Sequence, residues 1–306
     1  MLGRLVARFM VSRIRRHLLV GGLLLTLAGC RLDAPPQELR QLQAVTDPLL
    51  VANHVQTTPI HFTLQLGDAA AFWALRSGLC RPSNPEDSEA CANWSHQAPG
   101  PVTSGTEAQV HRLAYLLGSA NAITFPHGLI AFDRSFFLEH QDDPGALRCV
   151  VAHELTHFLH RHSYLSAKAE AITYRHLPEP ARKKALAALS QQQELAADRN
   201  AMLMVAVAGH DPATCLRELQ LTAELDASYN PEDPLGSHPG QDRRLGAARR
   251  YLADGLPEDL RRRRQVLARE RTPRRRPQWN WNQADHLYTV RTVPPATGAS
   301  NWWPDS

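Results

Sequence analysis

Residues 149–163 read CVVAHELTHFLHRHS, and four histidines fall within ten residues of this stretch. The stretch is apolar and contains no proline or glycine, so we expect one helix over residues 144–163, with Asp143 as its candidate N-cap. On that helix His153 and His157 are four residues apart, which places them on one face about one turn apart. Two imidazoles at this spacing can close on one zinc ion, as in the HExxH motif.

Glu154 directly follows the first of these two candidate ligands. A carboxylate there can take a proton from water, while zinc lowers the pKa of that water and polarises a peptide carbonyl. The sequence therefore predicts a zinc site with Glu154 as general base, although the five-residue motif alone is a moderate signal.

Two further histidines, His160 and His162, follow the motif. His160 shares the face of His153 but lies about 10.5 Å farther along the axis, at 1.5 Å per residue, which is too far for the same metal ion. On a continuous helix His162 points elsewhere. We therefore expect both to be helix-end histidines near the negative end of the helix dipole.

A catalytic zinc ion needs a third protein ligand, and the stretch QELAADRNA, residues 193–201, offers two acids. Glu194 and Asp198 are again four residues apart, on a helix expected over residues 181–209. Glu194 could bind zinc while Asp198 orients a ligand histidine from behind. Taken alone, two acids on one helix face are more often solvated surface.

The first 29 residues have the pattern of a lipoprotein signal peptide. Five arginines precede an apolar run, Leu18 to Ala28, that is too short for a comfortable membrane span. The run ends in LAGC, which resembles the bacterial lipobox, so Cys30 would carry lipid and anchor the mature chain. The alternative is an ordinary signal peptide that happens to contain this cysteine. Arg31, in place of an aspartate, favours the outer membrane.

Removal of this leader changes the charge balance. The whole chain has 34 basic and 30 acidic residues, and the leader takes five basic ones, which leaves 29 against 30. The mature chain is therefore not basic, and we expect no nucleic-acid partner.

Four cysteines remain after Cys30, and an exported chain meets an oxidising compartment, so two disulfides are expected in one of three connectivities. Cys80 and Cys91 flank a polar loop, which makes a local bridge the first choice. Cys149 and Cys215 would then join the HExxH helix to a later helix. The alternative for this second pair is two buried thiols.

The remaining chain is expected to be mostly helical, with a small sheet. Expected helices lie within residues 31–55 and at 212–226, 241–253 and 258–270, expected strands lie at 60–66 and twice within 121–132, and residues 81–106 read as a loop. Periodicity leaves HRLAYLLGS, residues 111–119, ambiguous between helix and strand. Residues 272–306 look like an irregular tail whose tryptophans either cover the core or contact a partner.

Several motifs, in order, resemble those of gluzincin metallopeptidases of the HtpX and BepA type, relatives of the prenyl-protein proteases. HELTH followed by ELAADR matches their HExxH and ExxxD pair, and the RH after HELTH, Arg161-His162, fits the family helix. AGHDP at 208–212 resembles their AGYDP, and SHPGQDRRL at 237–245 resembles their HP-x4-R segment. SANAITFPHGLIAF resembles their NAF-x-LPGG-x-I-x-V segment, with His127 where the family usually has glycine. The matching positions in this segment are Asn121, Ala122, Pro126, Gly128 and Ile130. The resemblance covers about residues 111–253.

The resemblance implies one Zn²⁺ per chain, bound by His153, His157 and Glu194, with Asp198 behind a ligand histidine. His238 and Arg244 would lie near the metal, where such residues are suggested to bind the oxyanion or to shield the zinc.

The resemblance also implies that residues 111–119 form a strand leading into Asn121. This edge strand would line the cleft and let a substrate backbone add as a further strand. The segment from Asn121 to Ile130 is therefore the predicted substrate edge.

We thus predict an α+β, mostly helical, zincin-type fold with a small β-sheet whose edge strand lines the cleft. The predicted segments are a signal peptide (1–29), an N-terminal segment with a helix, a strand and a disulfide loop (30–106), a zinc metallopeptidase domain (107–271) and a tail (272–306).

The predicted function is that of a zinc endopeptidase in the bacterial periplasm, anchored to the membrane through lipidated Cys30. Its implied partners are misfolded or misassembled envelope proteins, which it would cleave. One alternative is a latent zinc protein that acts mainly as a chaperone or binding module. Another is a structural envelope lipoprotein whose HExxH is accidental.

Overall fold

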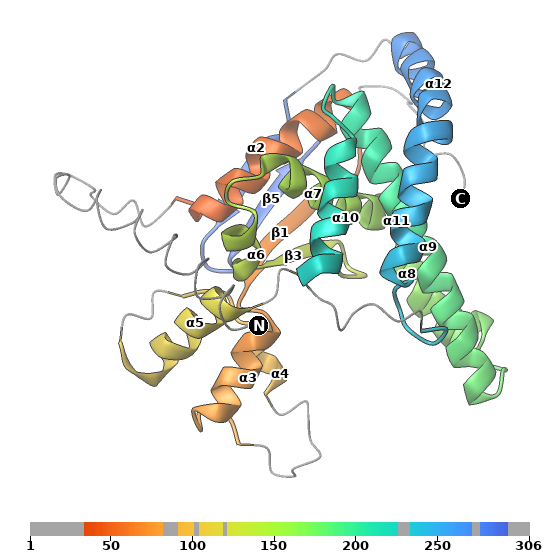
Figure 1. Ribbon diagram of the computed structural model, residues 1–306. Coiled ribbons are helices and arrows are strands. Elements are labelled where there is room, and N and C mark those ends of the chain that lie inside the picture. Colours follow the sequence, from red (N-terminus) through yellow and green to blue (C-terminus); the bar gives the residue numbers. More distant parts are fainter. Residues whose placement is uncertain are drawn as a thin grey trace, which may run out of the picture. The chain divides into compact units, whose positions relative to one another are not determined.

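A computed structural model describes residues 34–81, 91–100, 104–118, 121–225, 233–270 and 276–292 (Figure 1). The helices and strands of the described residues all lie in one compact unit, Pro35–Ser306. The predicted signal peptide, Cys30, Trp302 and Trp303 lie outside the described residues. Within the described residues, no helix has the length and apolar character needed to cross a membrane.

A small mixed sheet packs against several helices, which confirms the α+β, mostly helical prediction. Its strands are β1 (Ile60–Gln65), β2 (Ala122–Thr124), β3 (Leu129–Asp133), β4 (Gln278–Asn282) and β5 (Leu287–Arg291), in the order β2-β3-β1-β5-β4. β1 pairs parallel with β3, and the other pairs are antiparallel. The strands predicted at residues 60–66 and within residues 121–132 are therefore present.

Helices account for most of the described chain. They are α2 (Gln37–Ala52), α3 (Asp68–Arg76), α4 (Ala92–Ser95), α5 (Gly105–Leu117), α6 (Arg134–Glu139), α7 (Pro144–Leu159), α8 (His162–Lys168), α9 (Glu179–Val207), α10 (Ala213–Leu225), α11 (Gln241–Arg250) and α12 (Leu256–Arg269), with π-helical turns η1 (Ala169–Thr173) and η3 (Tyr251–Gly255). Each region predicted to be helical contains a helix. Gly209, at φ +80°, follows the long helix α9 and ends it, because this left-handed conformation favours glycine.

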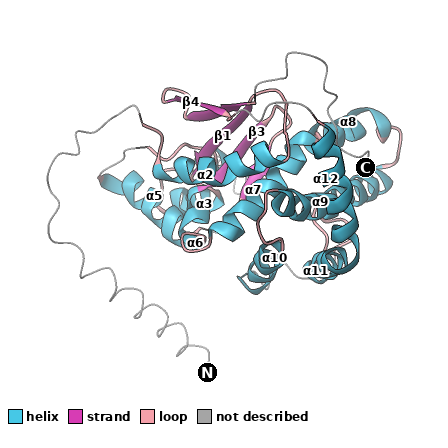
Figure 2. Ribbon diagram, turned by 90° about the horizontal axis from the view of Figure 1, so that it is seen from above, coloured by secondary structure: helices cyan, strands magenta, loops and turns pink. Residues whose placement is uncertain are grey.

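The central helix α7 begins as its sequence indicates. Asp143 Oδ1 accepts hydrogen bonds from the backbone N–H groups of Gly145 and Ala146, both at 2.9 Å, and Pro144 takes the first helical position, where no N–H is needed. α7 packs against α2, α9, α10 and strand β2. Figure 2 shows α2 and α7 against one face of the sheet.

The main core lies between this sheet face and the helices. Phe62 and Phe132 of the sheet, Val151 and Leu155 of α7 and Met202 of α9 are all 0% exposed. Burying a side chain of this size contributes about 1.5–3 kcal/mol, so this core stabilises the packing of α7 against α9 and the sheet.

The prediction of a strand at residues 111–119 is wrong, because α5 runs through to Leu117. Val110 and Ala114, four residues apart, are fully buried against Ala70 and Ala74 of α3 in a small separate cluster. This i, i+4 pattern is that of a helix packed on a helix. The edge strand of the sheet is instead the short β2.

The prediction of one continuous helix over residues 144–163 is also wrong. α7 ends at Leu159, Arg161 adopts a left-handed conformation at φ 56°, and α8 begins at His162. A non-glycine residue in this conformation costs about 1–2 kcal/mol. His162 and Ser163, the two residues after Arg161, make hydrogen bonds that act against that cost.

The predicted irregular tail contains an ordered hairpin, β4–β5, which pairs with β1. Trp279 of β4 stacks on Phe62 with ring centroids 5.6 Å apart, and its indole N–H donates to Asp47 at 2.7 Å. This tryptophan therefore covers the core. The alternation in WNW, residues 279–281, is a period-two signal of the kind that marks a strand.

Both predicted disulfides are present, Cys80–Cys91 and Cys149–Cys215. The second joins α7, which carries the HExxH motif, to α10. Disulfides of this kind indicate an oxidising compartment outside the cytoplasm.

Asp133, at the end of β3, is a buried carboxyl group that lies outside the HExxH motif. It is 2% exposed and accepts a hydrogen bond from the Gln65 amide at 2.8 Å. Burial, helped by nearby Asp68, raises its pKa from 3.8 to about 7. The folded chain thus binds a proton that the unfolded chain releases at lower pH.

We expect Asp133→Asn to flatten the dependence of stability on pH. Because the folded-state pKa is raised, the wild type loses stability as pH rises from about 4 through about 7, by on the order of 4 kcal/mol at most. Urea unfolding at pH 5 and pH 8 measures this difference. Asp68→Asn, at an exposed position, is the control and should keep most of the slope, whereas an equal slope in wild type and Asp133→Asn would contradict the prediction.

Candidate metal centre

Three candidate ligands from two helices lie together. His153 and His157 project from α7, and Glu194 projects from α9, which packs along it. The two Nε2 atoms are 3.0 Å apart, and each lies 3.4 Å from an oxygen of Glu194. The predicted ligand set is thus assembled as a group that could hold a metal ion.

His153 is backed by a carboxylate. Its Nδ1 lies 3.0 Å from Asp198 Oδ1, on the side of the ring away from Glu194. Arg244 donates to both oxygens of Asp198, at 2.9 and 2.7 Å. This bidentate pair fixes Asp198, which in turn fixes the ring of His153.

The charges of this cluster compensate one another. Burial alone would raise the pKa of Asp198, but Arg244 and His153 together outweigh burial and hold it well below its ordinary value. Burial disfavours charge on His153, yet Asp198 and Glu194 raise its pKa to about 10. Burial and the neighbouring His153 lower the pKa of His157 to about 3. The two acids therefore stay ionised in a site suited to positive charge.

Glu154, the predicted base, is 6% exposed and is held by strand β2. The hydroxyl of Thr124 lies 2.7 Å from its Oε2 and 3.0 Å from its backbone oxygen. Burial raises the pKa of Glu154 above its ordinary value. A more basic carboxylate is better able to accept a proton near neutral pH.

The structure also brings His238 and Arg244 to the cluster. His238 Nε2 lies 3.9 Å from Glu194 Oε1, and its side chain is 45% exposed. Its Nδ1 is 3.0 Å from the hydroxyl of Ser237. Arg244 also lies 3.9 Å from Glu194, although its main partner is Asp198.

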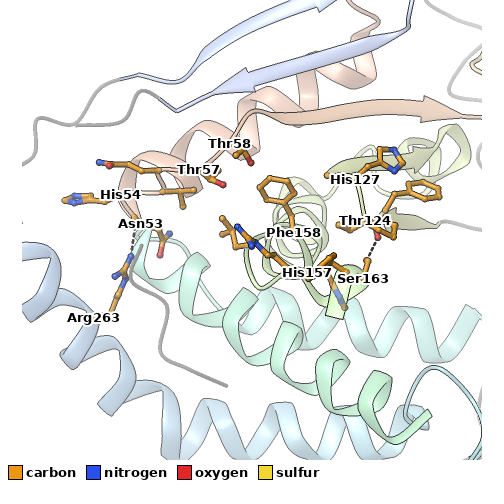
Figure 3. A pocket seen from close by; sticks show the side chains of 18 of the residues that line it. Asn53, His54, Thr57, Thr58, Thr124, His127, His157, Phe158, Ser163 and Arg263 are labelled. Atoms are coloured by element: carbon orange, nitrogen blue, oxygen red, sulfur yellow. Dashed lines mark hydrogen bonds between the residues drawn. The ribbon is translucent and has the colours of Figure 1, made fainter. Parts of the chain in front are cut away.

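Two cavities flank the cluster, and β2 borders both. The smaller, of about 170 Å³, is lined by Asn121, Ala122 and Glu154 among others. The larger, of about 590 Å³, is lined by Thr124 and His157 and by residues of the β2–β3 turn (Figure 3).

Only part of the predicted substrate edge, the segment from Asn121 to Ile130, lines these two cavities. Asn121 and Ala122 line the smaller cavity, and Pro126 and Gly128 line the larger one. Ile130 does not line either, because it is fully buried on β3 and faces Phe62 of β1.

Sequence reasoning missed the role of residues after the helix break. Arg161 turns the chain, so that His162 is 4% exposed and its Nδ1 lies 3.1 Å from Nδ1 of His157. The expectation that His162 points elsewhere is therefore wrong. The next residue, Ser163, donates to the backbone oxygen of Thr124 at 2.6 Å (Figure 3). The local sequence does not predict the break between α7 and α8, because neither glycine nor proline occurs at it.

No family model, curated protein or solved structure matches this chain.

Proposed function

We propose that this protein is a zinc-dependent endopeptidase. The observation that carries the proposal is the assembly of two imidazoles and a carboxylate beside the buried carboxylate of Glu154. Two atoms that each bind zinc at 2.0–2.1 Å in a tetrahedron are about 3.3 Å apart. The two Nε2 atoms, 3.0 Å apart, are close to that spacing, and each lies 3.4 Å from a different oxygen of Glu194.

Zinc, when bound here, would polarise a peptide carbonyl and make water acidic enough to attack near neutral pH. Glu154 would accept the proton of the attacking water and pass it to the leaving amine. Thr124 holds the Glu154 carboxylate through one oxygen, at 2.7 Å, which keeps its orientation fixed. Asp198 and Arg244 keep His153 oriented from the opposite side.

The backbone of β2 supports a polypeptide as substrate. Asn121 O accepts from Asp133 N and Phe125 N donates to Leu129 O, so these residues face β3. By the alternation of an antiparallel pair, the backbone groups of Ala122 and the backbone N–H of Thr124 point away from β3, while the carbonyl oxygen of Thr124 already accepts from Ser163. An extended chain could pair with these groups beside the metal centre, as in other cases of strand addition. Misfolded envelope proteins, which expose extended segments, are the substrate class we propose.

Casein cleavage with and without a chelator tests this function. We expect cleavage by purified protein to stop in the chelator and to return when zinc is added. Cleavage that is insensitive to the chelator would reject zinc catalysis. Zinc binding without any cleavage, together with suppression of client aggregation, would favour the alternative of a chaperone or binding module.

We further propose a lipid-anchored location on the periplasmic side of the bacterial outer membrane. The LAGC motif supports the anchor, and the two disulfides support an oxidising compartment. Mass spectrometry of the mature protein is expected to find Cys30 as the N-terminal residue, modified by a diacylglyceryl group. An unmodified Cys30 in protein isolated from membranes would reject the anchor.

His238 is expected to hold basal activity down. Its Nε2, 3.9 Å from Glu194, is close enough to cover the open side of the metal centre. His238→Ala should therefore raise the rate of casein cleavage, measured with Glu154→Gln as the blank. A drop of about 100- to 1,000-fold would instead assign His238 to oxyanion binding. An unchanged rate would leave it as a loop residue.

A further inference from the structure

We propose that His162 positions the metal ligand His157 by accepting a hydrogen bond from it. The inference rests on the proposed metal site and goes beyond the HExxH and ExxxD residues. Two observations carry it, namely the contact between the rings and the break in the helix that creates the contact.

The two nitrogens of His157 face different partners. Nε2 lies 3.0 Å from His153 Nε2 and 3.4 Å from Glu194, so it is the nitrogen that faces the metal centre. Nδ1 lies 3.1 Å from Nδ1 of His162, on the opposite side. A neutral imidazole carries one proton, and a nitrogen that binds a metal cannot keep it. The proton of His157 therefore sits on Nδ1 and is donated to Nδ1 of His162, whose own proton sits on Nε2.

The position of His162 is built by the fold. Five residues along a continuous helix correspond to about 140° of rotation, which would turn its side chain away from His157. The left-handed residue Arg161, at φ 56°, turns the chain and brings the ring back to 3.1 Å from His157, where His162 is 4% exposed.

Helix α9 holds His162 from the other side. The side-chain amide of Gln193 donates to the backbone oxygen of His162 at 3.3 Å, and its carbonyl accepts from Ser166 at 2.9 Å. Gln193 directly precedes the ligand Glu194. The supporting contact of His157 is thus tied to the same helix that supplies the third ligand.

The two histidine ligands consequently have different support. His153 is backed by the carboxylate of Asp198, whereas His157 is backed by a neutral ring. Removal of a group that orients a ligand typically weakens metal binding about 10- to 100-fold. We expect a loss of this size when His162 can no longer accept a hydrogen bond.

Zinc affinity, measured by competition with a chromophoric chelator, tests the inference without reliance on activity. His162→Phe keeps an aromatic ring but has no acceptor, and it should weaken binding about 10- to 100-fold. His162→Gln offers a carbonyl acceptor and should recover part of the affinity. His160→Phe is the matched control, because His160 contacts the ring of His162 at 5.4 Å and is not one of the donors that meet at the metal centre. This control should bind zinc within about threefold of wild type.

Wild-type affinity in His162→Phe would overturn the inference while leaving the metal site intact. Equal zinc binding by wild type and Glu194→Ala would instead overturn the metal site, and the inference with it. If His162→Phe fails to fold, by circular dichroism, the comparison of His162→Gln with His162→Ala decides. Equal losses in these two variants would show that hydrogen-bond acceptance is not the role of His162.

Discussion

Glu154→Gln should bind about one zinc ion per chain and lose casein cleavage. Glutamine has nearly the same shape and can still accept the hydrogen bond that Thr124 gives to Glu154 Oε2 at 2.7 Å. It cannot take a proton, and general acid–base catalysis typically contributes about 100- to 10,000-fold to the rate. We therefore expect cleavage to fall by at least about 100-fold while the metal ligands stay in place.

Elemental analysis of the purified variant and a casein assay measure these two properties separately. Glu170→Gln, at an exposed position on η1, is the control and should match wild type in both. Undiminished cleavage by Glu154→Gln would remove Glu154 as the base. Loss of zinc from this variant would indicate that Glu154 is a ligand.

Glu194→Ala should lose both zinc and cleavage. Glu194 contributes one of the three donors, and burial raises its pKa less than His153, His157 and Arg244 together lower it, so it stays ionised. Without this carboxylate two neutral donors remain, and zinc affinity should fall by more than the about 10- to 100-fold typical of residues that only support a ligand. Chelator competition measures the loss directly.

Glu179→Ala is the matched control, because Glu179 lies in the exposed first turn of the same helix and pairs with Lys183. It should leave zinc affinity unchanged. Full zinc affinity in Glu194→Ala would remove Glu194 as the third ligand, whatever the rate of cleavage.

The parts of this centre that depend on helix geometry could be predicted from the sequence. A spacing of four residues fixes the separation of His153 and His157 on α7, and of Glu194 and Asp198 on α9, because an α-helix has one geometry. The residues that the HtpX and BepA resemblance marked, His238 and Arg244, also lie at the centre. The proton-accepting and metal-binding roles remain predictions.

The parts that depend on packing between distant segments could not be predicted. The sequence of residues 111–119 suits a strand or a helix, and contact with α3 favours the helix observed through Leu117. His162 reaches His157 only because Arg161 leaves the helical conformation, and the contacts that favour this come from β2 and α9. The sequence around Thr124 indicates only a strand residue, and its hydrogen bond to Glu154 depends on the tertiary fold.

The place of β1 in the sheet also governs how the chain can fold. His61 pairs with Leu129, 68 residues later, and Ile60 pairs with Val290, 230 residues later. Pairings between such distant residues are slow to form, since a long loop must close before any contact is gained. Because synthesis starts at the N-terminus, one edge of β1 therefore stays unpaired until the β4–β5 hairpin has been made. An open apolar edge invites pairing with other chains. A truncated chain that ends before the hairpin would keep every candidate metal ligand. It would nevertheless expose Phe62 and be prone to aggregate. Burial of β1 therefore depends on β4 and β5, the last strands of the chain.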